Sequence, residues 1–305
     1  MKSYTSASFI SESPCVTALG CFDGVHIGHT RLICEAKKIA LQKSLTCAVW
    51  SFNSPPKSYF SKSSTPLLTT ESEKRICMSR LGVDIFVSVT FNEDIANISA
   101  RDFFYDILID KMNTKSIVCG YNYRFGKNGE GDISLLDKLC KESHIELVTV
   151  PEVTLHGKTV SSSEIRTALK EGRLEEAQEM LGRPYSLRAK VCDGQHLGRK
   201  LGFPTINQVF NPNKLLGKNG VYVSRVFLGH QKKYGITNIG TRPTVNGNLL
   251  CAETHIFDFE GDLYKKAVTV ELLSYLREER KFSSLDELCE QVQKDIATAK
   301  KFINK

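Results

Sequence analysis

The chain has 305 residues, of which 41% are hydrophobic and 25% charged, a composition typical of a globular protein with room for two ordinary domains. No apolar run approaches the roughly 20 residues of a membrane-spanning helix, and the first residues lack the apolar segment of a secretion signal. The formal net charge of +7 suits anionic ligands without separating nucleotides from nucleic acid. We therefore expect a cytoplasmic protein that needs no membrane partner.

The first half of the sequence alternates apolar runs of strand length with helical patterns. Strands are predicted at 15–22, 45–52, 84–91, 116–120 and 145–150. A helix follows the first strand, and another is predicted at 71–81, where Thr70 and Glu73 have the spacing of a capping box and Gly82 follows the end. Strands that alternate with helices build a parallel sheet, so we expect a Rossmann-like, doubly wound α/β domain.

A helical stretch over 161–182, with Gly182 as its stop signal, leads into a different pattern. Short β-rich runs follow at 185–192, 220–227, 232–239, 249–257 and 266–275. They predict a compact antiparallel β-barrel. A closing amphipathic helix is predicted from about residue 284, with an apolar face formed by Leu285, Leu288, Val292, Ile296, Ala299 and Phe302. We place the first domain at 1–183 and the second at 184–305.

Two histidines stand in the loop between the first predicted strand and the first helix, within the string GCFDGVHIGH at residues 20–29. Open α/β sheets bind ligands at the carboxyl ends of their strands, and the free N–H groups at a helix start favour phosphate. Imidazoles placed there can stabilise charge on a reacting phosphate without any covalent nucleophile. A pair of surface histidines in a turn is the alternative interpretation of His26 and His29.

This string resembles the His-x-Gly-His signature of the nucleotidyltransferase superfamily, and a second motif supports the resemblance. Residues 161–166 (SSSEIR) are similar to the superfamily's Ser-Ser-Thr-x-Ile-Arg motif, in which hydroxyls, helix N–H groups and Arg hold the β- and γ-phosphates. Taken alone, this segment would be an ordinary capping box. The resemblance implies catalytic roles for His26 and His29, and nucleotide binding by Gly20, Phe22, Asp23, Gly24, Gly28, Ser162, Ser163 and Arg166.

Between these motifs, residues 118–127 (VCGYNYRFGK) resemble the Gly-x-(Asp/Asn)-(aromatic)-Arg-Phe-Gly segment of bacterial FAD synthetases. A strand followed by a generic turn is the alternative interpretation. Here the resemblance becomes specific, to the bacterial bifunctional riboflavin kinase/FAD synthetase family. It implies that Asn122 contacts the nucleotide and that Phe125 contacts the flavin.

The second half contains no Walker sequence, so a P-loop kinase is excluded by motif. Instead, residues 198–207 (GRKLGFPTIN) resemble the Gly-Arg-x-Leu-Gly-Phe-Pro-Thr-Ala-Asn signature of riboflavin kinases. A plain basic turn before a strand is the alternative interpretation. The resemblance implies that Gly198 and Arg199 bind the nucleotide. It also implies that Thr205 and Asn207 hold Mg–ATP, contacting both the nucleotide and the metal.

Downstream, Glu253 begins a Glu-x-His segment in a predicted strand, and Arg277 belongs to a Leu-Arg…Phe element ahead of the last helix. Judged alone, a Glu in a strand is more often a surface residue. The resemblance implies that Glu253 is the general base for the 5′-hydroxyl of riboflavin, which requires hydrogen-bond reach between the two groups. It also implies a flavin-binding role for Arg277.

The family resemblance implies two reactions that use ATP as co-substrate and Mg²⁺ as cofactor. Riboflavin and ATP give FMN and ADP in the barrel, and FMN and a second ATP give FAD and pyrophosphate in the α/β domain. Three departures from the family pattern are visible: Cys21 replaces Asn or Thr, no His stands beside Pro55, and Lys265 replaces a turn Gly. We expect both activities, with the adenylyltransferase as the weaker one.

Two other functions stay open at this point. One is a kinase that carries an inactive transferase domain. The other, of a different class, is a flavin- or RNA-binding regulator, which would use a basic patch with interleaved aromatic residues. The sequence contains no such run, so we expect small-molecule substrates and no nucleic-acid partner.

Overall fold

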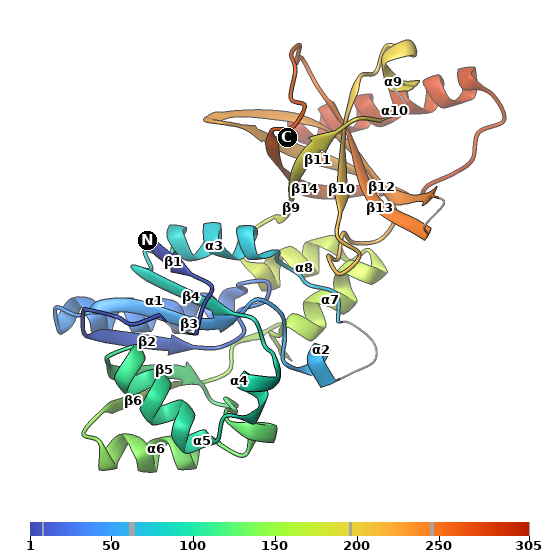
Figure 1. The fold of residues 1–305 in the computed structure, drawn as a ribbon. Coiled ribbons are helices and arrows are strands. Elements are labelled where there is room, and N and C mark those ends of the chain that lie inside the picture. The colour runs from blue at the N-terminus through green and yellow to red at the C-terminus, as the bar shows by residue number, and fades with distance from the viewer. Residues whose placement is uncertain (8, 61–64, 195–196, 245–246, 305) are drawn as a thin grey trace. The chain divides into compact units, whose positions relative to one another are not determined.

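The computed structural model describes residues 1–7, 9–60, 65–194, 197–244 and 247–304 (Figure 1). The chain divides into two compact units, Met1–Ser162 and Ser163–Lys305. The helical stretch before residue 183 therefore groups with the barrel by its contacts. The functional boundary at 183/184 stays a prediction.

The first unit is built on a parallel sheet, as the alternation of strands and helices predicted. Its strands are β1 (Lys2–Tyr4), β2 (Cys15–Leu19), β3 (Thr46–Phe52), β4 (Ile85–Val89), β5 (Thr114–Gly120) and β6 (Glu146–Val150). Their order is β1-β4-β3-β2-β5-β6, and every neighbouring pair is parallel. The chain runs outward from β2 through β3 and β4, then returns to β2's other side with β5. The strand order thus reverses beside β2, where open sheets form a ligand crevice.

Helices cover both faces of this sheet (Figure 1). Alternate strand residues pack against α1 (Ile27–Gln42) and α3 (Glu71–Arg80) on one face, and against the π-helix η1 (Phe103–Lys111) and α6 (Ile133–Glu142) on the other. The shorter elements are α2 (Lys57–Phe60), α4 (Glu93–Asn97), α5 (Ala100–Asp102), η2 (Lys127–Gly129), β7 (Thr154–Leu155) and β8 (Lys158–Thr159). The predicted capping box of α3 is confirmed, because Thr70 and Glu73 each bond the other's backbone N–H.

The second unit is a closed antiparallel barrel with its predicted closing helix. Helices α7 (Ser162–Glu171) and α8 (Leu174–Leu181) precede it, and α8 ends at Gly182 in the left-handed conformation. The barrel order is β10-β13-β12-β11-β14-β9. The remaining bounds are β9 (Tyr185–Cys192), α9 (Leu197–Lys200), β10 (Thr205–Phe210), β11 (Gly220–Leu228), β12 (Gln231–Thr244), β13 (Gly247–Ile256), β14 (Ala267–Arg277) and α10 (Leu285–Ile303).

The apolar face predicted for α10 is partly wrong at its two ends. Val292, Ile296 and Ala299 pack on the barrel's apolar cluster as expected. Leu285 is 54% exposed and Phe302 is 43% exposed, so neither belongs to the contact face. The helix touches the barrel through its middle turns, and a helical pattern alone does not show where along its length a helix meets its neighbour.

Lys265, where the family pattern has Gly, adopts a left-handed backbone with a φ of 62°. A side chain in this region costs about 1–2 kcal/mol, partly offset by the greater entropy that Gly loses on folding. We expect Lys265→Gly to stabilise the second unit by about 0.5–1 kcal/mol, measured by thermal unfolding. Lys266→Gly is the matched control, since its φ is negative and the change should be destabilising there. Equal destabilisation by both substitutions would contradict the prediction.

Candidate active sites

The loop after β2 and the loop after β5 lie at the reversal point of the parallel sheet. Residues 20–26 leave β2, and Asn122 follows the end of β5, the neighbour of β2 in the sheet. The Oδ1 atom of Asn122 lies 3.6 Å from where a Cβ on Gly120 would stand, so its side chain folds back over the strand end. The fold therefore gathers these predicted nucleotide-binding segments at one edge.

His26 and His29 stack on each other at the start of α1. His26 is the N-cap residue, and its Nδ1 accepts a hydrogen bond from the backbone N–H of His29 over 3.3 Å. The ring centroids are 3.6 Å apart with an interplanar angle of 19°. Because an accepting Nδ1 carries no proton, the neutral His26 ring has its proton on Nε2. Gly28 permits this stack, since a Cβ there would lie 3.2 Å from the His26 ring.

The carboxylate of Asp23 holds the histidine loop to the segment before α3. It accepts hydrogen bonds from the backbone N–H groups of Leu68 and Thr69 and from the Thr69 hydroxyl, at 3.0–3.1 Å. The Thr69 hydroxyl in turn accepts the N–H of Gly24 over 3.0 Å. Asp23 is 3% exposed, so these contacts fix the loop conformation. Its predicted nucleotide contact stays a prediction.

Lys74 on α3 is a buried cation at the same strand ends that sequence reasoning missed. Its Nζ donates to the carbonyl oxygens of Cys21 (3.1 Å) and Phe52 (2.6 Å), at the carboxyl ends of neighbouring strands. The side chain is 2% exposed, and this burial lowers the pKa of Lys74. The sequence shows only that Lys74 lies one turn after the Thr70 cap, and this position does not indicate its tertiary partners.

The start of α7 also meets the histidine loop. The Ser162 hydroxyl donates to the carbonyl oxygen of Asp23 over 2.8 Å, while Ser163 is exposed. Arg166 follows one turn later on the same helix, in the second unit, and is 9% exposed. The structure thus brings Ser162, the second serine of the SSSEIR motif, to the GCFDGVHIGH loop. The phosphate contacts of Ser163 and Arg166 stay predictions.

Two predicted ligand residues of the first unit have buried aromatic rings. Phe22 is fully buried in the core against Gly20, so that a nucleotide could meet only its backbone, which has a φ of 50°. Phe125 is 6% exposed and lies parallel to the ring of Tyr123, with centroids 5.8 Å apart. A flavin contact by Phe125 would use the narrow exposed part of its ring.

In the second unit, the predicted kinase residues meet on neighbouring strands. Glu253 on β13 stands in register with Asn207 on β10 and with Asn238 on β12. Thr205 and Asn207 are two residues apart on β10, so their side chains leave the same face of the strand. A carboxylate, an amide and a hydroxyl therefore converge on one part of the barrel wall.

Two cavities flank Thr205, which lines both. The first, of about 240 Å³, holds the predicted residues Gly198, Glu253 and Arg277 and has largely apolar walls. The second, of about 570 Å³, is lined by Arg199 and by the polar turn 260–264. Asn207 is 7% exposed and lies beside these cavities rather than on the described walls. The smaller cavity, with a mostly apolar surface, thus adjoins a larger one that is lined by Arg199 and by the carboxylates of Glu260 and Asp262.

Gly194 leaves room for the Asn207 side chain. A Cβ at Gly194 would stand 2.6 Å from the Asn207 Cγ, well inside contact distance. Gly194→Ala should therefore displace the Asn207 amide and lower kcat/KM for ATP in riboflavin phosphorylation by about 10–100-fold. The test is steady-state kinetics of FMN formation, with FAD formation from FMN as the internal control. An unchanged kcat/KM for ATP would mean that the position of the Asn207 amide does not matter.

His255 is a second residue that sequence reasoning left without a role. Its Nδ1 lies 2.9 Å from the carbonyl oxygen of Pro204. A carbonyl oxygen only accepts, so Nδ1 carries a proton and the ring is fixed next to Thr205. The Glu-x-His spacing places Glu253 and His255 on one face of β13, which is the signal that could have identified it.

Comparisons with known proteins match the two parts of the chain to two different families of enzymes. A family model described as FAD synthetase matches residues 9–164, and one described as riboflavin kinase matches residues 181–303. A bifunctional riboflavin kinase/FMN adenylyltransferase from Buchnera aphidicola is 35% identical, covering 96% of this chain and 95% of its own. The enzyme of the same name from Escherichia coli strain K12 is 34% identical and covers 99% and 98%.

A solved structure gives the same overall fold under a different description. It is called a macrolide-efflux protein from Streptococcus pneumoniae, is 30% identical and superposes with a TM-score of 0.88 over 98% of this chain and 99% of its own. Within the described residues of our chain, no helix has the length and apolar character to cross a membrane. By its full-length sequence matches and its two matching family models, the chain belongs to the bifunctional riboflavin kinase/FMN adenylyltransferase family.

Proposed function

We propose that this protein makes both flavin cofactors, phosphorylating riboflavin to FMN in the barrel and adenylylating FMN to FAD at the parallel sheet. The observation that carries the kinase assignment is the register of Glu253 with Asn207, next to two cavities that share Thr205. The residues of the histidine loop and the start of α7 support the adenylyltransferase. ATP is the co-substrate of both reactions.

In the kinase reaction, the smaller cavity receives the flavin and the larger one the nucleotide. Glu253 lies on the wall of the smaller cavity, where its carboxylate can accept the proton of the 5′-hydroxyl as that oxygen attacks the γ-phosphorus of ATP. Arg199 on the wall of the larger cavity contributes a charge that suits the nucleotide phosphates. Gly198, the residue before it, lines the smaller cavity and binds the phosphates where the two cavities adjoin at Thr205. The bond between the γ-phosphorus and the β,γ-bridging oxygen breaks, and this oxygen leaves as part of ADP.

The donor atoms near Glu253 suit Mg²⁺. Thr205 and Asn207 offer a hydroxyl and an amide oxygen from one strand face, and Mg²⁺ prefers a few such hard oxygen ligands beside substrate phosphates. We propose that these two residues hold the metal of Mg–ATP. When bound, Mg²⁺ offsets the negative charge of the phosphate oxygens during transfer.

In the adenylyl transfer, a phosphate oxygen of FMN attacks the α-phosphorus of ATP and pyrophosphate leaves. His26 and His29 stabilise the charge that builds on the α-phosphate, with the Nε2–H of His26 as a donor. The nucleotide is bound by the backbone of the glycine-rich loop and by Asn122, Ser162, Ser163 and Arg166. Asp23 keeps this loop in its conformation. No protein nucleophile is required.

A cytoplasmic location suits two reactions that consume ATP. We propose a functional boundary near residue 183, and the riboflavin kinase match, which begins at residue 181, supports this proposal. The test is a chromatographic time course of the purified protein with riboflavin, ATP and Mg²⁺. We expect FMN to rise first and then convert to FAD. FMN without FAD would leave only the kinase, and no product would favour a flavin-binding regulator.

A further inference from the structure

Asp295 places a carboxylate in the middle of the apolar contact face of α10. Its neighbours on that face, Val292 and Ile296, pack on the barrel's apolar cluster. Asp295 itself is 5% exposed. Burying an ionised carboxylate is costly unless it is paired and hydrogen-bonded, so this position requires a specific partner.

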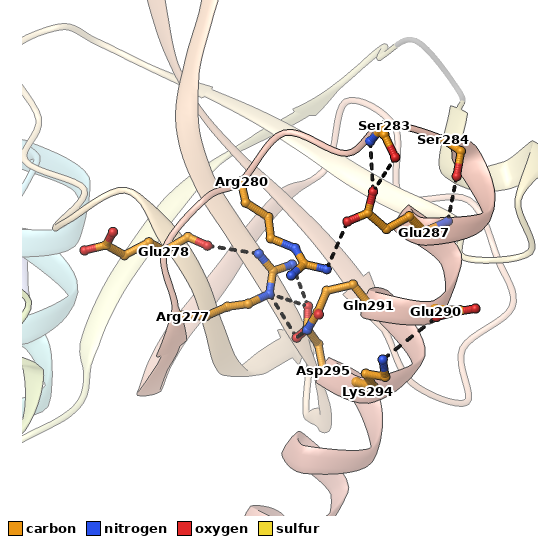
Figure 2. Close-up of polar contacts among 10 residues, drawn as sticks. All are labelled: Arg277, Glu278, Arg280, Ser283, Ser284, Glu287, Glu290, Gln291, Lys294 and Asp295. Carbon is orange, nitrogen blue, oxygen red and sulfur yellow. Dashed lines mark hydrogen bonds and ion pairs between the residues drawn. The ribbon is translucent and has the colours of Figure 1, made fainter.

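The partner is Arg277, the last residue of β14 (Figure 2). Its Nε lies 3.0 Å from both carboxylate oxygens of Asp295, and its Nη2 donates to Oδ2 over 2.7 Å. Gln291, one turn earlier on α10, donates to Oδ1 over 2.7 Å. The remaining Nη1 of Arg277 donates to the carbonyl oxygen of Glu278 over 2.9 Å. Every nitrogen of the guanidinium is thus engaged within the protein.

This ion pair lies on the wall of the smaller cavity, which the catalytic candidates also line. Asp295 and Arg277 both line the cavity that Glu253 and Thr205 also line. The loop between β14 and α10 is fixed at its far end as well, because Ser283 donates its N–H and hydroxyl to Glu287 (Figure 2). The strand end, the loop and the helix therefore meet at Arg277.

The pair determines where the guanidinium plane lies. The Cζ of Arg277 is 5.9 Å from the ring centroid of Phe282, and that of Arg280 is 4.6 Å from the same ring. A buried ion pair adds little stability compared with apolar side chains of similar size. Its clearer consequence is geometric, since a bidentate pair fixes a planar group in one orientation.

We infer that Asp295 is a positioning residue of the kinase site, which orients Arg277 and the adjoining loop so that the cavity wall fits the flavin ring of riboflavin. The inference rests on the proposed function of this cavity. Arg277 contacts the ring through the face of its guanidinium group, and Asp295 acts only through Arg277. Loss of the pair should therefore weaken riboflavin binding more than the phosphoryl transfer step.

The test compares Asp295→Asn with Glu271→Gln in the full-length protein. Glu271 is the matched control because its carboxylate also pairs with an arginine, with the Arg225 Nε 2.8 Å away, and is 9% exposed on the same barrel. It lines neither of the two cavities around Thr205. Three quantities are measured: the dissociation constant of riboflavin from fluorescence quenching without ATP, KM and kcat for FMN formation, and the rate of FAD formation from FMN.

We expect Asp295→Asn to raise the riboflavin dissociation constant and KM on the order of 10-fold, with kcat changing less than about 3-fold. Asp295→Glu should recover part of the affinity, and Glu271→Gln should leave it unchanged. Unchanged riboflavin binding in Asp295→Asn, or the same loss in Glu271→Gln, would overturn the inference. If Asp295→Asn does not fold, the double change Arg277→Met with Asp295→Leu removes the pair without an unpaired charge, and normal riboflavin binding by it also overturns the inference.

Failure of the proposed function would have a different signature. Direct riboflavin binding does not depend on turnover, so it tests Asp295 even if the wild-type protein makes no FMN. A wild-type protein that binds riboflavin without phosphorylating it would overturn the kinase assignment and leave the positioning role supported by the binding data.

Discussion

Glu253→Gln is expected to lower kcat for riboflavin phosphorylation by about 10²–10⁴-fold while leaving the conversion of FMN to FAD unchanged. The amide keeps the size of the side chain and the register of β13 but cannot accept the hydroxyl proton as a base. Riboflavin affinity should change little, because the loss falls on the transition state. The measurement is initial rates of FMN and FAD formation by chromatography, with each substrate supplied separately.

A second carboxylate in the same cavity sharpens this test. Glu279 also lines the cavity wall and accepts a hydrogen bond from Asn238 over 3.0 Å. We expect Glu279→Gln to keep kcat within about 10-fold of the wild type, since an interaction with neutral Asn238 survives as an amide pair. A large loss in Glu279→Gln with an active Glu253→Gln would move the base to Glu279.

The fold could be predicted where strands are apolar and helices carry their own caps. The core strands β2 to β6, the capping box of α3 and the Gly182 stop of α8 all follow from local patterns. The barrel strand β10 was missed because half of its sequence, TINQVF, is polar and the apolar residues do not alternate along it. Gln208 on that strand is fully buried, and its amide nitrogen donates to the backbone carbonyls of Ala189 and Val268, partners that only the closed barrel brings within reach.

Other elements were missed for different reasons. The edge strand β1 has three residues, too few for a periodic pattern. Helix α6 was not predicted, although Asp132 is its N-cap residue and Leu136 and Leu139 follow at helical spacing and are buried. The π-helix η1 depends on its packing against the sheet, which no local pattern specifies.

The candidate sites were predictable where a motif is contiguous and obscure where it depends on tertiary pairing. The string around His26 and the Thr205–Asn207 pair were visible in sequence. Lys74 and Asp295 were not, because each is a charged residue on a helix whose partner is a strand end elsewhere in the chain. Helical charges are usually solvated, and only the burial of these two shows that they are fixed in place.

His26→Asn should lower the rate of FAD formation from FMN by about 10²–10³-fold while FMN formation from riboflavin stays normal. Asn is a strong N-cap residue, so this variant keeps a cap on α1 where His26 now accepts the N–H of His29. It removes the imidazole that is stacked 3.6 Å from His29 and with it the Nε2–H donor for the α-phosphate. The loss should appear in the chemical step of FAD formation.

His26→Ala provides the comparison that separates capping from catalysis. It removes both the cap and the donor, so it should match the rate loss of His26→Asn and also lose about 1 kcal/mol of stability in the first unit. Thermal unfolding and FAD formation from FMN are measured for both variants. If His26→Asn retains normal FAD formation and only His26→Ala loses it, then His26 serves the helix start alone, and the charge on the α-phosphate must be stabilised by His29 and the loop backbone.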